Sequence, residues 1–215
     1  MGNADGVIIQ GDGPLFYFDS DPLCRFLAKA KIGCRPEEIW GRISQLDLVY
    51  CEQTNTPNPL ENFNKGESLE SFFEDVKRVL FIDKLDYEEF VHIWCNSIHI
   101  PSNRMHRLMP QLKVPVVAVV NTNHAHWESI RMYNYFARNV NCFALSFKSK
   151  MVMPSSAMLA FAHKKLEERL HRKILNPVYI GSRETHLAVA AKLNIMACHA
   201  DDQNLPQQLE KLGII

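Results

Sequence analysis

Two pairs of polar residues stand where a ligand or metal site could form. His124 and His126 follow an apolar run, and imidazole nitrogens are common ligands of transition metals. Asp201 and Asp202 offer two adjacent carboxylates, which are groups that hard cations prefer. Neither pair has a third ligand close in sequence. We therefore expect the histidines to be loop residues that could touch a ligand, and the aspartates to be a helix cap or a solvated loop.

The cysteines argue against a zinc site. All six are scattered, and none forms the Cys-x-x-Cys pair that zinc sites usually contain. This pattern is typical of reduced, buried thiols in the cytoplasm. The N-terminus shows no signal peptide, and no apolar run approaches the roughly 20 residues that span a bilayer. We expect a cytoplasmic protein without a membrane partner.

The charge balance bears on the classes of partner. Lys and Arg together number 24, as do Asp and Glu, so the formal net charge is zero. Such a chain lacks the long-range positive field of a dedicated nucleic-acid or membrane-surface binder. We expect no nucleic-acid partner. A local basic patch would have to arise through the fold.

Short apolar runs that are rich in β-branched residues predict buried strands. They cover residues 6–9, 114–120, 142–146, 177–180 and 195–198. Helical patterns follow three of them, over residues 124–139, from Ser155 or Ser156 to Leu170, and over 184–193. Alternating strands and helices predict a parallel sheet with crossover helices, which is a Rossmann-like α/β core.

A long helical segment interrupts this alternation after the first strand. Helical patterns cover residues 22–31, 36–49, 69–81 and 87–98, with Asp86 as an N-cap for the last. Residues 53–66 are rich in Asn, Pro and Thr and predict a loop. We expect a core of residues 1–20 and 110–215, with an all-helical cap inserted at residues 21–109.

This layout resembles the haloacid dehalogenase superfamily, in its branch with a helical cap after the first strand. Residues 7–15, Val-Ile-Ile-Gln-Gly-Asp-Gly-Pro-Leu, resemble the family's first motif, in which a strand ends in an Asp nucleophile and a second acid lies two residues beyond. Gln10 stands at the nucleophile position, and Asp12 at the second acid. The resemblance covers nearly the whole chain, including a Leu-Gly-Ile stretch at residues 212–214 and a cap segment around Gly66.

The other three family motifs are present in order but altered. Val120, followed by Asn121, stands where a Ser or Thr would hold the phosphoryl group. Met153 stands at the position of a Lys before Pro. Gly181 and Ser182 replace the two acids that end the fourth motif's strand, and His186 replaces a later Asn.

These substitutions remove the groups that the family's reaction needs. The resemblance implies an aspartyl-phosphate mechanism assisted by Mg²⁺ and a Lys. An amide is a poor nucleophile and a weak Mg²⁺ ligand, glycine has no side chain, and methionine carries no charge. Loss of a nucleophile alone usually costs several orders of magnitude in rate. We expect no catalysis, no cofactor, and loss of the family's Mg²⁺ site.

A second register remains open. Residues 16–18 are apolar and precede Asp19 and Asp21, so they could be the first motif, with Asp19 as nucleophile and Asp21 as acid. The Gly that lets the family's chain turn sharply is missing there, and Asp21-Pro22 suits a helix start. In this register too, the fourth motif lacks its acids.

We therefore expect a pseudo-phosphatase that binds a protein partner or a small ligand between cap and core. One alternative is a weak or atypical hydrolase that uses Asp19 or Asp12, and another is a purely structural module within a larger assembly. The expected ligand contacts follow the second predicted strand: Asn121, Thr122, Asn123 and His124.

Overall fold

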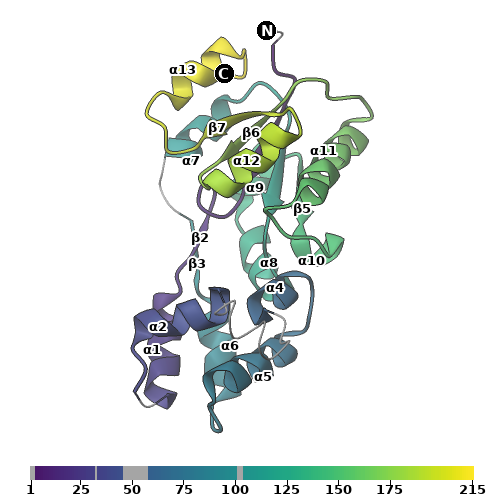
Figure 1. The fold of residues 1–215 in the computed structure, drawn as a ribbon. Coiled ribbons are helices and arrows are strands. Elements are labelled where there is room, and N and C mark those ends of the chain that lie inside the picture. Colours follow the sequence, from purple (N-terminus) through teal and green to yellow (C-terminus); the bar gives the residue numbers. More distant parts are fainter. Residues whose placement is uncertain (1–2, 32, 46–57, 101–103) are drawn as a thin grey trace.

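The polypeptide folds into two lobes joined by a short two-stranded ribbon (Figure 1). The computed structural model describes residues 3–31, 33–45, 58–100 and 104–215. The sheet lobe comprises residues 3–16 and 104–215, and the described part of the helical lobe comprises residues 21–31, 33–45 and 58–95. The ribbon consists of β2 (Tyr17–Phe18) and β3 (Ile98–His99), which pair antiparallel where the chain leaves and re-enters the sheet lobe.

The sheet lobe contains five parallel strands in the order β5-β4-β1-β6-β7. Helices cover both faces of this sheet, so its strands are apolar on both sides, and this burial accounts for their continuous apolar runs. The predicted parallel α/β fold is confirmed, with each strand within two residues of its expected bounds. The strands are β1 (Gly6–Gln10), β4 (Val116–Val120), β5 (Cys142–Leu145), β6 (Pro177–Gly181) and β7 (Met196–His199).

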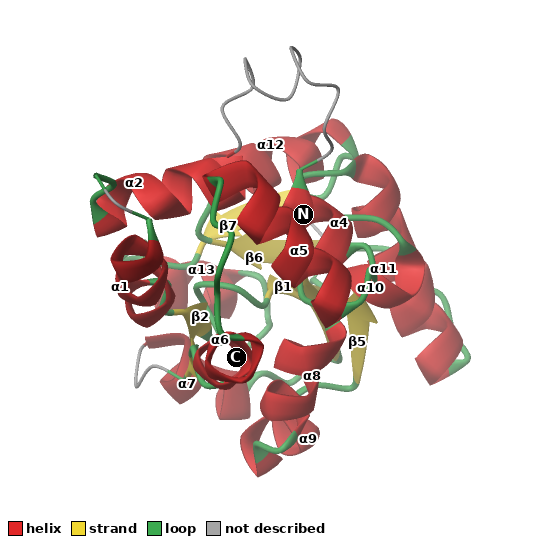
Figure 2. Cartoon of the chain, turned by 90° about the horizontal axis from the view of Figure 1, so that it is seen from below, coloured by secondary structure: helices red, strands yellow, loops and turns green. Residues whose placement is uncertain are grey.

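Figure 2 shows helices on both sides of the sheet, and alternate residues of β1 belong to two different buried clusters. Ile8 and Tyr179 belong to a cluster with α11 (Ser156–Leu170) and α12 (Glu184–Lys192). Val7 and Ile9 belong to the opposite cluster. Helices that add side chains to that cluster include α7 (Arg104–Leu108), α8 (His124–Arg131) and α13 (Leu205–Lys211). The sheet lobe also contains the short helices η2 (Met109–Gln111), α9 (Asn134–Asn139) and α10 (Ser146–Ser149).

The helical lobe has an aromatic core of its own. The rings of Phe63 and Phe72 stack 4.5 Å apart, and Trp94 lies 4.7 Å from Phe72. Asp86 caps the last helix by accepting from the amide of Glu89 at 2.7 Å, as predicted. The helices of this lobe are α1 (Asp21–Ala30), α2 (Pro36–Trp40), the π-helix η1 (Gly41–Gln45), α4 (Pro59–Asn64), α5 (Leu69–Leu80) and α6 (Tyr87–Cys95).

Three predicted elements need correction. The loop expected at 53–66 contains helix α4, because Asn58 accepts from the amide of Glu61 at 3.0 Å and Pro59 occupies the first helical position. The single helix expected at 124–139 is two helices, α8 and α9. The helix expected at 87–98 ends at Cys95, after which Ile98 pairs with Phe18 in the ribbon. Residues 46–49 and 53–57 of the predicted elements lie outside the described part of the chain.

Residues on the return from the helical lobe pack with the sheet. Ile98, Met105 and Leu108 lie in the same buried cluster as Val7 and Ile9. The proposed division at residues 20 and 109 stays a prediction. Across the described ranges, no helix combines the length and apolar character needed to cross a membrane.

Candidate functional site

The sheet register brings three of the altered motif positions together. Gln10 ends the central strand β1, which is flanked by β4, ending at Val120, and β6, ending at Gly181. The carboxyl edge of a parallel sheet is where open α/β folds bind ligands, and here it faces the helical lobe (Figure 1). Asp19 follows the ribbon strand β2 instead. Its carboxylate accepts a hydrogen bond from the backbone N–H of Asp21 at 3.0 Å. The residue that ends the central strand is therefore Gln10, because Asp19 lies beyond the ribbon.

The amide of Gln10 is buried and bonded on both sides. Gln10 is only 3% exposed. The Nε2 group donates to the carbonyl of Asp12, and Oε1 accepts from the backbone N–H of Ser182 at 3.1 Å. A Cβ atom added to Gly181 would lie 2.8 Å from Gln10 Oε1 and 2.7 Å from a ring carbon of Tyr179. The Gln10 amide therefore fills space that any side chain at Gly181 would need.

In the register that places Gln10 at the nucleophile position, Asp12 is the carboxylate that remains, and it is ion-paired. It contacts the guanidinium of Arg183, which lies just beyond β6. Burial raises the pKa of Asp12, and the charge and hydrogen bond of Arg183 oppose that rise. Gly13 keeps the backbone close, since a Cβ there would lie 2.6 Å from the Ser182 hydroxyl and φ is +100°. Sequence reasoning gave Arg183 no role, although it lies within the fourth motif.

Asn121 and Met153 form a second neutral pair. The Asn121 amide donates to the Met153 carbonyl and accepts from the Met153 N–H, both at 2.8 Å. The Met153 side chain packs in the sheet cluster beside α11. Val120 is fully buried, and its Cγ2 lies 2.9 Å from the position of a Cβ on Gly11. Where the family places a hydroxyl and an ammonium, this chain places packed apolar groups.

The segment after β4 connects the two lobes through His126. Asn123 caps α8 by accepting from the N–H of His126 at 2.9 Å, and His126 Nε2 lies 2.9 Å from the Trp94 carbonyl. Burial lowers the pKa of His126 to about 4, so the ring is neutral at physiological pH. Thr122 is buried and bonds through its N–H to the Ser146 hydroxyl at 2.9 Å. His124 is exposed on α8 against Phe147, so both histidines are helical rather than loop residues.

The position after the altered fourth motif is also neutral. His186 is 4% exposed, and its Nδ1 lies 3.3 Å from the Tyr179 hydroxyl. Burial, assisted by the nearby positive charge of Arg183, lowers the pKa of His186 to about 4. Burial also raises the pKa of Tyr179. An uncharged hydrogen-bonded pair thus underlies the strand end where the family has acids.

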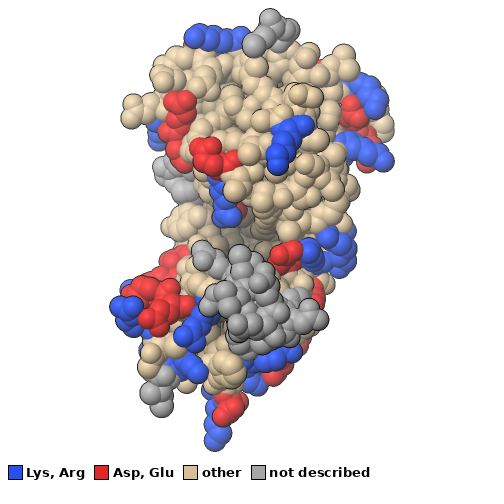
Figure 3. Space-filling model, in the orientation of Figure 1, with Lys and Arg blue, Asp and Glu red and all other residues tan. Residues whose placement is uncertain are grey.

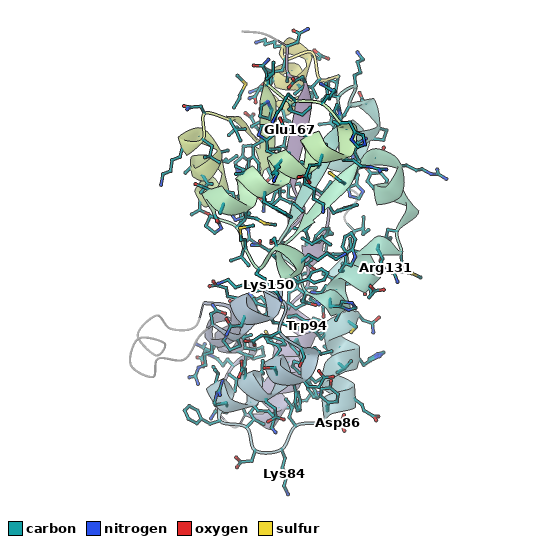
Figure 4. The ribbon with its side chains drawn as sticks, turned by 90° about the vertical axis from the view of Figure 1, so that its right-hand side faces the viewer. Lys84, Asp86, Trp94, Arg131, Lys150 and Glu167 are labelled. Carbon is teal, nitrogen blue, oxygen red and sulfur yellow. The ribbon has the colours of Figure 1, made fainter. Side chains whose placement is uncertain are left out.

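A pocket of about 450 Å³ lies between the two lobes beside these groups. Trp94 lines this pocket, and Figure 4 shows it where the helical lobe meets the sheet lobe. Trp94 Nε1 is buried and has no hydrogen-bond partner in the described part of the chain. The sheet lobe and ribbon contribute Asp12, Phe16, Phe18, Ile98, Asn121, Thr122, Asn123, His126, Val152, Met153 and Arg183, and the helical lobe contributes Trp40, Ser44, Asn58, Leu60, Glu61, Asn64 and Trp94.

The pocket brings together some of the predicted ligand contacts and not others. Asn121, Thr122 and Asn123 are among the described lining residues, whereas His124 is not. Gln10, which was predicted at the nucleophile position rather than as a ligand contact, is not among them either. The seven lining residues of the helical lobe were missed. The spacing of the aromatic residues in that lobe predicts burial, and Trp94 is indeed in its core, but spacing does not show which core residues also face the other lobe.

The donor groups at this edge do not fit a magnesium site. Gln10, Gly181 and Ser182 offer no carboxylate, and Asp12 already holds Arg183. Within the described ranges, no group of three His, Cys, Asp or Glu residues is placed to hold a metal ion. Asp202 accepts from the N–H of Asn204 at 2.8 Å and belongs to the turn before α13.

The surface carries no dominant charge on the face that Figure 3 shows. Basic and acidic residues lie beside one another on both lobes, which a narrower waist separates. Many form pairs within one helix, such as Arg131 with Glu128 and Lys77 with Glu74. Exposed pairs of this kind contribute little to stability. The pocket rather than the surface is therefore the candidate site.

Comparison with solved structures relates this architecture to known proteins. A HAD family enzyme from Bacteroides thetaiotaomicron, in complex with magnesium and inorganic phosphate, superposes with a TM-score of 0.65 at 18% identity, covering 95% of this chain and 98% of that one. A predicted HAD-like family hydrolase from Porphyromonas gingivalis gives 0.64 at 13% identity, covering 98% of each chain. L-2-haloacid dehalogenase from Xanthobacter autotrophicus, with chloropropionic acid covalently bound, gives 0.60 at 13% identity, covering 99% of this chain and 84% of that one.

No family model and no curated protein matches the sequence. At such low identities the structural likeness establishes the fold, while activity has to be argued from the site. The fold that the motif order implied is confirmed: the chain has the haloacid dehalogenase-like fold.

Proposed function

We propose that this chain is a pseudo-phosphatase that binds a small ligand in the pocket between its lobes and does not hydrolyse phosphate esters. The observation that carries the proposal is the Gln10 amide, bonded to the backbone of Asp12 and Ser182 and packed on Gly181. The nucleophile position thus holds a group with a structural role. An amide in this position can neither attack phosphorus nor bind Mg²⁺ well.

The charge of the pocket supports the same conclusion. Arg183 is the single Lys or Arg among the described lining residues, and its guanidinium is paired with Asp12. Glu61 adds a carboxylate, which is ion-paired with Lys65 at 2.5 Å between Oε1 and Nζ. A phosphate dianion would meet no unpaired cation in this lining. Electrostatic stabilisation of the transition state is usually the largest contribution to catalysis, so its loss implies negligible turnover.

A small ligand fits better than a protein partner. A volume of about 450 Å³ lies in the range of small-molecule sites, and the lining combines aromatic residues with amide and hydroxyl side chains. Trp94 also lines the pocket, and its buried Nε1 has no hydrogen-bond partner among the described residues. A cytoplasmic location forms part of the proposal, and it agrees with the free thiols of Cys24, Cys34, Cys95, Cys142 and Cys198.

Thermal shift with Mg²⁺ and beryllium fluoride, a phosphate mimic, tests the proposal. We expect no stabilisation of the wild-type chain and no hydrolysis of p-nitrophenyl phosphate. Gln10→Asp alone should not restore turnover, because Gly181, Ser182 and Met153 still lack the metal-binding and charged groups. Stabilisation of wild type by Mg²⁺ plus the mimic, but by neither alone, would refute the proposal.

The alternative is an atypical hydrolase. Asp12 favours it, because this carboxylate lines the pocket and is about 29% exposed. Asp19 has no such position. If the wild type hydrolyses an activated ester, Asp12→Asn should abolish that activity while Asp19→Asn leaves it intact. Activity that neither substitution changes would exclude both carboxylates.

A further inference from the structure

A second cleft opens at the opposite end of the sheet from the pocket. It lies at the amino ends of β4 and β5, between the last turns of α9 and α11, and has a volume of about 590 Å³. Three separate segments of the chain build it. Its lining comprises Met109, Pro110, Leu112, Lys113, Val114, Pro115, Val116, Arg138, Asn139, Val140, Asn141 and Arg169.

The charged residues of this cleft are all basic. Lys113, Arg138 and Arg169 line it, and the described lining contains no Asp or Glu. None of the three has an ion-pair partner in the described chain, whereas Arg131 and Lys173, for example, are paired with nearby carboxylates. A chain with zero net charge has therefore concentrated uncompensated positive charge at one place.

Helix electrostatics explain this arrangement only in part. Arg138 and Arg169 lie in the last turns of α9 and α11, where basic side chains favour the helix dipole. That reason does not apply to Lys113, which lies between η2 and β4 outside any helix. It also does not explain why the two helix ends and this lysine line one cavity.

The positive field reaches the first residue of β5. Burial raises the pKa of the Cys142 thiol to about 11, and the charges of Lys165 and Arg169 act against that rise. Lys165 lies one turn before Arg169 on α11. A fourth cation thus contributes to the field beside the cleft.

We propose that this cleft binds a small multivalent phosphate anion, independently of the pocket between the lobes. Two guanidinium groups offer paired donors that suit phosphate oxygens, and Lys113 adds a compact charge. The volume is within the range of small-ligand sites, and the surface that the cleft exposes is mostly polar. The three basic side chains come from three separate segments, so they can contact the anion from different sides.

Calorimetry with sodium tripolyphosphate tests this site. We expect binding at 50 mM salt that weakens strongly by 500 mM, since the contacts are charge-dependent. Lys113→Gln, Arg138→Gln and Arg169→Gln should each reduce the affinity by roughly tenfold or more, in line with charge-assisted hydrogen bonds. Lys84→Gln and Lys192→Gln serve as matched controls, because both lysines are exposed and lie outside the cleft. Figure 4 shows Lys84 at the far tip of the helical lobe.

Three results would overturn the proposal. The first is no binding at 50 mM salt by a wild-type chain with a normal thermal midpoint. The second is binding that the cleft variants and the controls weaken equally. The third is tighter binding of a single-stranded oligonucleotide, lost in the same variants, which would indicate a nucleic-acid site instead. Each cleft variant is checked for an unchanged thermal midpoint without ligand.

Discussion

Acidification should weaken this protein through His126, which lies where the two lobes meet. Its Nε2 lies 2.9 Å from the Trp94 carbonyl, and its Nδ1 lies 3.3 Å from Asn123 Nδ2. The neutral ring satisfies both contacts if Nε2 carries the proton, donating to Trp94 and accepting from Asn123. A proton added at Nδ1 would oppose the Asn123 amide donor. The folded state therefore favours the neutral ring.

The size of the effect follows from the two pKa values. Burial lowers the pKa of His126 from 6.5 to about 4, so between these values the unfolded chain binds more protons than the folded one. The contribution of His126 to the free energy of unfolding is fully present above pH 6.5 and is lost progressively as the pH falls from 6.5 to 4. Proton linkage gives a loss of about 2 kcal/mol on going from pH 7 to pH 5. His186, whose pKa is also lowered to about 4, adds a loss of the same sign.

Urea unfolding of wild type and His126→Gln at pH 7 and pH 5 measures this contribution. The variant should be less stable at pH 7, but its further loss at pH 5 should be about 2 kcal/mol smaller than that of wild type. His92→Gln is the control, because His92 is an exposed histidine on α6. Equal pH dependence in wild type and His126→Gln would refute the reasoning.

Three further predictions concern the site and the contact between the two lobes. Gly181→Ala should destabilise the chain by about 1–3 kcal/mol in urea unfolding, because the new Cβ would lie 2.8 Å from Gln10 Oε1. Gly66→Ala should cost a similar ~1–3 kcal/mol, since φ there is +101° and the Cβ would lie 2.8 Å from a carbonyl of the sheet lobe; faster proteolysis between the lobes would report it. Asp12→Asn removes the ion-pair partner of Arg183, so inorganic phosphate should bind the pocket more tightly than in wild type, by calorimetry.

The strands could be predicted because a strand that is buried on both faces of a sheet is apolar along its whole length. Runs such as residues 116–120 are apolar throughout, and their bounds need no tertiary information. Helix α4 was missed because Asn58 and Pro59, which read as loop residues, are also the residues that start a helix. Local composition cannot separate these two roles without the packing of Phe63 behind them.

The site was predictable only as a set of positions. Motif order identified Gln10 and Ser182, but their hydrogen bond joins residues 172 positions apart and depends on β1 lying beside β6. The walls from the helical lobe depend on how that lobe meets the sheet, which spacing along a helix does not encode. Arg183 illustrates the same limit, because its partner Asp12 is distant in sequence.

These long-range contacts make the altered motif positions interdependent. An acid at position 181 needs the space that the Gln10 amide occupies, and an acid at position 10 would place a carboxylate beside the Asp12 carbonyl that Gln10 now donates to. Each single reversion therefore creates a clash or an electrostatic repulsion before it contributes to metal binding. Changing both positions removes the clash between them but leaves Met153 without charge and Arg183 bound to Asp12. We therefore expect turnover to require replacement of several motif positions together, with single reversions losing stability and gaining no activity.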